Sequence, residues 1–198
     1  MRTNYILIDY ENVQPAALAI LDQEHFQVVV FVGASQTKIS FDIAAALQHI
    51  GSRAKYIKIA GNGSNALDFH IAYYIGSIAA REPDAYFHII SKDSGFDPLI
   101  QHLKTQQVLV CRSRKITDIP IVKAATAISP REKVEVIISN FQQRGTSKPR
   151  TLKTLSSTIN SLFLKQLSDE EVAVLIQELQ KHGTIRIQDT KVLYSLPT

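Results

Sequence analysis

Four aspartates follow the ends of predicted strands, where an open α/β sheet places its chemistry. Asp9 directly follows the first apolar run of the chain, and Asp68 follows the third run across a glycine-containing loop. Asp93 and Asp97 both follow the fourth run. Ligands of such sheets bind outside the carboxyl ends of the strands, near the point where the strand order reverses. The spacing therefore predicts that three or four carboxylates converge on one small crevice.

Several carboxylates packed together repel one another and resist ionisation, and a divalent cation removes that penalty. Mg²⁺ and Mn²⁺ favour hard oxygen ligands, and such an ion can activate water for in-line displacement at a phosphoryl group. The sequence holds one cysteine and no cluster of histidines that would favour a softer metal. We therefore expect Mg²⁺ or Mn²⁺ as the cofactor.

Five short apolar runs supply the strands that would position these acids. Near-continuous runs rich in β-branched residues are typical of a parallel sheet buried on both faces. Candidate helices alternate with them: one opened by Pro15, one capped by Ser40, one over residues 66–80, and one opened by Asp97-Pro98. The predicted strands are residues 5–8, 28–32, 56–59, 87–90 and 108–110. This order predicts a three-layer, doubly wound α/β domain with strand order 3-2-1-4-5.

The pattern changes after Ser129-Pro130. Helical periodicity is predicted over residues 131–142 and 152–163, and Ser168 to Glu171 forms a capping-box signature for a third helix. Two short β runs, residues 185–187 and 192–194, then read as a hairpin. Three helices followed by a hairpin predict a winged helix-turn-helix. The predicted domains are residues 1–128 and 129–198.

Three segments together resemble the PIN-like and NYN nucleases: Asp9-Tyr10-Glu11-Asn12-Val13, Asn65-Ala66-Leu67-Asp68-Phe69-His70 and residues 91–100, Ser-Lys-Asp-Ser-Gly-Phe-Asp-Pro-Leu-Ile. The resemblance covers roughly residues 4–115, with a tail similar to the winged helix of some bacterial members. It implies a magnesium- or manganese-dependent endoribonuclease that hydrolyses phosphodiester bonds of RNA. It implies that Asp9, Asp68 and Asp93 bind the metal and that Asn12 belongs to the site.

The sequence departs from this pattern at one position. Many NYN members read Asp-Ser-Asp-Phe after the fourth strand, whereas Gly95 stands here at the second acid. Asp97 is a candidate substitute as a further catalytic and metal-binding acid, and its alternative role is a helix N-cap before Pro98. Asp42 is either a fifth acid of the site or a surface acid at a helix start.

Basic residues gather in two stretches that contain no acid, one between Asp97 and Asp118 and one between Glu135 and Asp169. The net charge is +4 and the sequence pI is near 9.1, which is compatible with a nucleic-acid partner. Such runs are either phosphate-binding patches or solvated faces. The candidate nucleic-acid contacts are Lys38, Arg112, Arg114, Lys115, Lys148, Arg150 and Lys153.

The leading hypothesis is a metal-dependent endoribonuclease whose winged helix holds RNA, another single-stranded nucleic acid or a partner protein. A catalytically inactive PIN-like regulator that binds nucleic acid is the alternative. An aspartyl-phosphate phosphatase is disfavoured because Glu11 stands where such enzymes have a second aspartate. No apolar run is long enough to cross a membrane, and the single cysteine excludes an internal disulfide framework. We therefore expect a cytoplasmic protein, with a homodimer left open.

Overall fold

The computed structural model describes residues 2–127, 129–145, 147–163 and 165–197. The chain forms two compact units, Met1–Ile119 and Pro120–Thr198, each with its own apolar core. The first unit is an α/β sheet domain, and the second is helical with a small antiparallel hairpin. Each unit is described separately below.

A five-stranded parallel sheet forms the centre of the first unit. Its strands are β1 (Asn4–Asp9), β2 (Phe26–Val32), β3 (Ala54–Lys58), β4 (Tyr86–Ile90) and β5 (Leu109–Ser113). They lie in the order β3-β2-β1-β4-β5 and all neighbours are parallel, as the sequence predicts. The order reverses between β1 and β4, so the loops that follow these two strands meet at the same edge.

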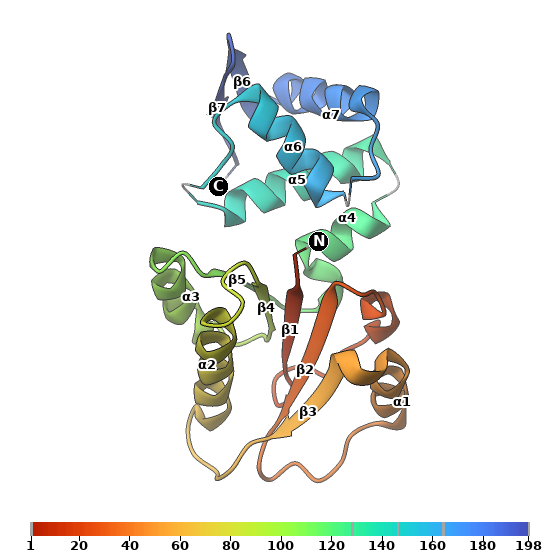
Figure 1. Cartoon of the computed structure of the whole chain (residues 1–198), viewed down its shortest axis with the longest axis vertical. Helices are drawn as coiled ribbons and strands as arrows, with labels where there is room; N and C mark the ends of the chain where they lie inside the picture. Colours follow the sequence, from red (N-terminus) through yellow and green to blue (C-terminus); the bar gives the residue numbers. More distant parts are fainter. Residues whose placement is uncertain (1, 128, 146, 164, 198) are drawn as a thin grey trace. The chain divides into compact units, whose positions relative to one another are not determined.

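Helices cover both faces of this sheet (Figure 1). Helix α1 (Phe41–Ile50) lies on one side, and α2 (Ala66–Ala79) and α3 (Phe96–Thr105) lie on the other. The Ser40 hydroxyl caps α1 by accepting a hydrogen bond from the backbone N–H of Ile43. The apolar side chains of α2 and α3 pack on alternate residues of β1, β2 and β4, including Leu7, Phe31 and Ile89. This packing holds the loop ends of the strands in place.

Two helix predictions are corrected by the structure. The helix predicted after Pro15 is only a short 3₁₀ turn, Leu18–Leu21, with Ala17 before it in the left-handed region. Helix α3 begins at Phe96 with Gly95 at its N-cap, so Asp97 lies inside the first turn and does not cap it. A further short 3₁₀ turn, Gly51–Arg53, precedes β3, and another, Ile116–Asp118, follows β5.

The second unit has four helices and a hairpin among the residues that are described. They are α4 (Pro120–Thr126), α5 (Pro130–Gln143), α6 (Leu152–Leu162), α7 (Asp169–Lys181), β6 (Ile185–Gln188) and β7 (Lys191–Tyr194). Capping boxes begin α5, α6 and α7, at Ser129, Thr151 and Ser168. Each box satisfies backbone donors that a helix start otherwise leaves unpaired. Thr151 also forms a bridge with Lys191, which extends the hairpin by one short antiparallel segment.

Helix α4 was not predicted, and it moves the division of the chain. Ala124 of α4 is buried in the core of the second unit, together with Val134 and Phe141 of α5. The compact units therefore divide between Ile119 and Pro120, whereas the sequence predicts a boundary between residues 128 and 129. Within the described ranges no helix is both long and apolar enough to span a membrane.

Candidate active site

Asp9 is the central residue of the candidate site. It ends β1 and is completely buried. Its Oδ2 accepts hydrogen bonds from Asn12 Nδ2 at 2.7 Å and from Ser91 Oγ at 2.7 Å, and its Oδ1 accepts one from the backbone N–H of Asn12 at 3.2 Å. Donors directed at a carboxylate favour its ionised form, so they offset the cost of burying a charge. Oδ1 accepts only the longer of these bonds and keeps a further lone pair.

Ser91 connects Asp9 with the loop that carries Asp93. Its hydroxyl donates to Asp9 and also accepts a hydrogen bond from the backbone N–H of Asp93 at 3.0 Å. The side chain of Asp93 then accepts a bond from the backbone N–H of Gly95 at 2.7 Å. One buried serine therefore fixes the positions of both acids. A serine after a strand is typical of ordinary turns, so the sequence by itself does not mark Ser91 as a site residue.

Asp68 lies in the first turn of α2, close enough to Asp9 and Asp93 to respond to their charges. Burial and the nearby charges of Asp9, Asp93 and Glu11 raise its pKa from 3.8 to about 6. A helix N-terminus stabilises a negative charge, so a purely dipole-satisfying aspartate would show the opposite tendency. The raised pKa shows that like-charge repulsion and burial outweigh the dipole here. The predicted convergence of Asp9, Asp68 and Asp93 is therefore present in the structure.

Glu11 is a fourth acid of this cluster that sequence reasoning missed. Its carboxylate lies where a Cβ on residue 33 would be: a Cβ built on Gly33 would stand 1.7 Å from Glu11 Oε1. Gly33 directly follows β2, so Glu11 reaches over the carboxyl end of the neighbouring strand. The pairing of an acid after β1 with a glycine after β2 was the available signal. It becomes meaningful only once β1 and β2 are known to be neighbours.

Asp97 is paired with an arginine and is not among the charges that raise the pKa of Asp68, so its role as a metal-binding acid stays a prediction. Both of its carboxylate oxygens accept hydrogen bonds from Arg112, from Nε at 2.8 Å and from Nη2 at 2.9 Å. This guanidinium holds the pKa of Asp97 below its usual range. A third bond, from Arg112 Nη1 to the carbonyl of Ser91 at 3.4 Å, ties the same arginine to the start of the loop. Arg112, predicted as a phosphate contact, is thus already engaged.

The other candidate residues lie on exposed positions outside the carboxylate cluster. Asp42 lies in the first turn of α1 and is not among the charges that raise the pKa of Asp68. Lys38, Arg114 and Lys115 are exposed on loops that follow β2 and β5, at the same sheet edge as the acids. They stay candidates for phosphate contacts.

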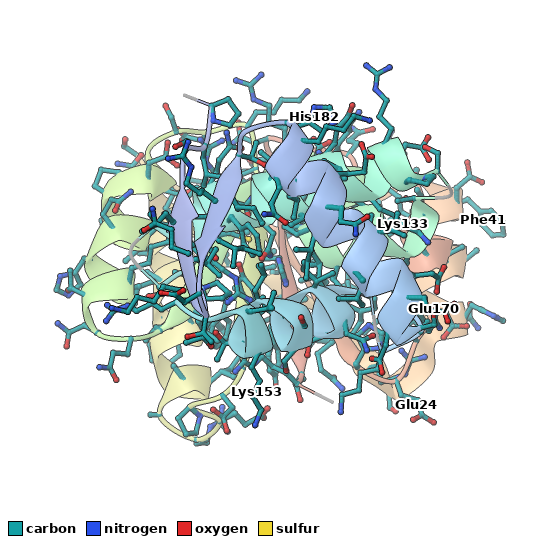
Figure 2. The ribbon with its side chains drawn as sticks, turned by 90° about the horizontal axis from the view of Figure 1, so that it is seen from above. Glu24, Phe41, Lys133, Lys153, Glu170 and His182 are labelled. Carbon is teal, nitrogen blue, oxygen red and sulfur yellow. The ribbon has the colours of Figure 1, made fainter. Side chains whose placement is uncertain are left out.

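The basic run of the second unit is only partly exposed. Lys148 is half-buried: its ammonium donates to the carbonyl of Gly145 and lies 5.7 Å from the centre of the Tyr194 ring. Arg150 and Lys153 are exposed, before and at the start of α6. Figure 2 labels Lys153 there and Glu170 in the first turn of α7.

The chemistry of the cluster is that of hard oxygen donors. Asp9, Glu11, Asp68 and Asp93 supply carboxylates, and Asn12 supplies an amide. Among the described residues, no three histidine, cysteine, aspartate or glutamate side chains are already arranged as a metal-binding group. Magnesium commonly takes only one or two carboxylates and completes its shell with waters and substrate phosphate. The donor set therefore fits a hard divalent cation without a closed cage.

Comparison with known proteins agrees with the topology of the first unit. A family model described as PIN domain matches residues 3–113, which is more than half of the chain. The chain belongs to the PIN domain family. Searches of curated proteins and of solved structures each return no match. PIN domains are usually nucleases and generally use divalent metal ions.

This PIN domain carries its acids on three chain segments: Asp9 and Glu11 at the end of β1, Asp68 in α2 and Asp93 in the loop after β4. The matched residues include Asp9, Asp68 and Asp93 and end at the last residue of β5. At Gly95, where the sequence departs from the NYN pattern, the backbone N–H binds Asp93, and a Cβ would stand 3.1 Å from Asp93 Oδ1. A larger residue at position 95 would therefore crowd the Asp93 carboxylate.

Proposed function

We propose that the first unit is a magnesium- or manganese-dependent endoribonuclease. One observation carries the proposal: the pKa of Asp68 is raised to about 6 by burial and by three other carboxylates at the same sheet edge. Concentrated negative charge in a crevice destabilises the folded chain when no cation is bound. A protein that keeps such a cluster has a use for the cation that neutralises it.

The proposed metal-binding residues are Asp9, Asp68 and Asp93. Glu11, beside Gly33, is a fourth acid of the cluster. When bound, one or two such ions supply an activated water and stabilise the attacking and leaving oxygens of the phosphodiester. Hydrogen bonds from neighbouring residues hold these acids in position. Asn12 and Ser91 orient the Asp9 carboxylate through three hydrogen bonds, and Ser91 sets the start of the Asp93 loop.

We assign the second unit as a winged helix that holds nucleic acid. The order of its elements supports this assignment: α5, the Thr151 bridge, α6, α7 and then the β6-β7 hairpin. Arg150 and Lys153 place positive charge beside this bridge. Together with the acids of the first unit, this arrangement supports placement in the NYN branch of PIN-like proteins. The single, buried cysteine accords with a cytoplasmic location.

An inactive PIN-like regulator is the second candidate function. The observation that favours it is the loss of a second acid in the β4–α3 loop: Gly95 replaces it, and Asp97 is paired with Arg112. Without a second acid in this loop, a nuclease would have to bind its metal through Asp9, Asp68 and Asp93. Cleavage measurements therefore separate the two functions.

The decisive experiment is a cleavage assay on end-labelled single-stranded RNA and DNA, with chelator, with magnesium or with manganese. We expect cation-dependent internal cleavage of RNA by the wild type. Asp9→Asn and Asp93→Asn should each abolish it, since each removes a proposed ligand without changing core volume. The control variant is Asp84→Asn, which removes an exposed carboxylate from the turn that precedes β4.

Full activity in both site variants would refute the assignment of these acids. Absence of cleavage under all conditions, combined with tight nucleic-acid binding, would establish the regulator instead. Cleavage of DNA alone would keep the nuclease and overturn the RNA preference.

A further inference from the structure

Helix α2, whose first turn carries Asp68, exposes two aromatic rings. Phe69 is 70% exposed and Tyr73 is 67% exposed, although large apolar side chains are normally covered. They are four residues apart, which places both on one face of the helix, one turn from each other. Asp68, the residue before Phe69, belongs to the cluster. A surface that begins at the candidate active site therefore carries two uncovered rings.

After Asp68, helix α2 carries no further acid beside these rings. From Phe69 to Ala80 the chain has no aspartate, glutamate, lysine or arginine, and Arg81 follows. Tyr74 lies edge-on to Tyr73, with the ring centres 5.5 Å apart. The ammonium of Lys55, on the edge strand β3, lies 5.5 Å from the centre of the Tyr74 ring. Exposed rings and a cation thus lie together, on a helix that has no acid after Asp68.

We propose that Phe69 and Tyr73 stack on bases of a single-stranded nucleic acid and that Lys55 attracts its phosphates. The inference rests on the proposed function and adds to it the surface of the first unit on which the unpaired bases of a single strand would lie. Proteins that bind single strands combine basic grooves with aromatic side chains, and stacking tolerates any base. Bases inside a duplex are stacked on one another and present no face to such rings. A single-stranded nucleic acid bound along α2 would bring its phosphodiester backbone to Asp68.

The first experiment uses the absence of tryptophan from the chain. Phe69→Trp introduces a single fluorescent indole on the proposed surface. The probe is an oligoadenylate of about ten nucleotides, a length suited to one binding site, and chelator is present throughout so that nothing is cleaved. We expect saturable quenching by the single strand, and little quenching by the matching duplex or by inorganic polyphosphate of similar charge.

Phe41→Trp is the matched control. Phe41 is 83% exposed at the start of α1, a helix on the other side of the sheet from α2, and it projects outward in Figure 2. Its indole should report no saturable quenching. Equal quenching at both positions would mean that the oligonucleotide contacts exposed rings indiscriminately, and this would overturn the proposal.

The second experiment removes the rings and keeps an apolar surface. Phe69→Leu combined with Tyr73→Leu should weaken oligoadenylate binding by about tenfold or more, because stacking contributes roughly 1–3 kcal/mol per base. Both residues are exposed in a helix, and leucine is a good helix former, so the variant should keep the wild-type Tm. Unchanged oligoadenylate affinity in this variant would refute the proposal.

A second copy of this chain is the competing occupant of the rings, and the same variants exclude or establish it. In that case the emission of Phe69→Trp would shift with protein concentration in the absence of oligonucleotide, and the leucine variant would keep self-association. Because binding is measured without metal, it is independent of cleavage. If the oligonucleotide does not quench Phe69→Trp but RNA is cleaved, only this inference is refuted. If it does quench Phe69→Trp but no RNA is cleaved, only the nuclease proposal is refuted.

Discussion

Asp68 is the carboxyl group of the site whose pKa responds to burial and to repulsion from the other acids. Its pKa is raised from 3.8 to about 6, so between these values the folded protein binds more protons than the unfolded chain. The free energy of unfolding therefore falls as the pH rises through this window, and the loss persists above it. A cation that binds only the folded state should restore what the repulsion removes.

Asp68→Asn should accordingly raise the Tm of metal-free protein at about pH 7.5 and leave it nearly unchanged at about pH 3, below both pKa values, where the wild-type carboxyl is mostly protonated in the folded and the unfolded state. Thermal melts in chelator at both pH values measure the difference. Asp84→Asn serves as control: Asp84 is exposed and lies outside the cluster, so this variant should keep the wild-type Tm at both pH values. A lower Tm for Asp68→Asn at the higher pH would show that Asp68 is stabilising.

Asp93 and Asp97 are four residues apart, yet they make different contacts: Asp93 accepts a bond from the Gly95 backbone, and Asp97 pairs with Arg112. Asp97→Asn should keep the stabilisation by magnesium or manganese, because its carboxylate pairs with Arg112 rather than with the cluster. It should lower the free energy of unfolding by no more than about 1 kcal/mol, since half of the Asp97 side chain is exposed.

Asp93→Asn should raise the metal-free Tm and shrink the gain from the metal, because it removes repulsion and a proposed ligand together. Paired melts of both variants, each with chelator and with millimolar metal, test the assignment. The opposite pattern, in which Asp97→Asn alone loses the metal response, would return Asp97 to the site.

At the scale of elements, the start of α6 is the most exposed cationic part of the second unit's basic run. If Arg150 and Lys153 contact phosphates, each contributes about 0.7 to the slope of log affinity against log salt on single strands. Replacing both by alanine should flatten that slope by roughly 1.4. Lys148→Ala should change it less, because the Lys148 ammonium already binds the Gly145 carbonyl and lies over Tyr194.

Binding measured over a range of salt concentrations checks this expectation. Lys181→Ala is a suitable control, since Lys181 lies at the far end of α7 and pairs with Glu178. If the double variant keeps the wild-type slope, the run at Arg150 and Lys153 is a solvated surface and nucleic acid binds elsewhere.

At the scale of the whole molecule, the chain is two cores joined between Ile119 and Pro120. A fragment of residues 120–198 should melt several degrees above one of residues 129–198, because the shorter fragment loses α4 and the burial of Ala124. The expected difference is roughly 1 kcal/mol, the order of burying the Ala124 methyl group and part of that of Ala127. Circular dichroism melts of both fragments measure it. Equal stability would place α4 outside the second core.

The sequence alone was sufficient to predict the sheet, its strand order and the meeting of Asp9, Asp68 and Asp93. These features follow from local patterns: buried parallel strands appear as apolar runs, and residues after such strands share one edge of the sheet. The capping box at Ser168 and the helices α5 to α7 are equally local, because each depends on residues within one or two turns.

Tertiary structure alone decided which polar groups contact one another. The pairing of Asp97 with Arg112 joins α3 to β5, and the position of Glu11 over Gly33 depends on β1 lying beside β2. Ser91 looked like a turn residue until its hydroxyl was found between Asp9 and the Asp93 backbone. Such contacts depend on distances between elements, which the spacing of residues along the chain does not encode. Periodicity therefore revealed where the acids gather, and only the folded chain showed which of them are already paired.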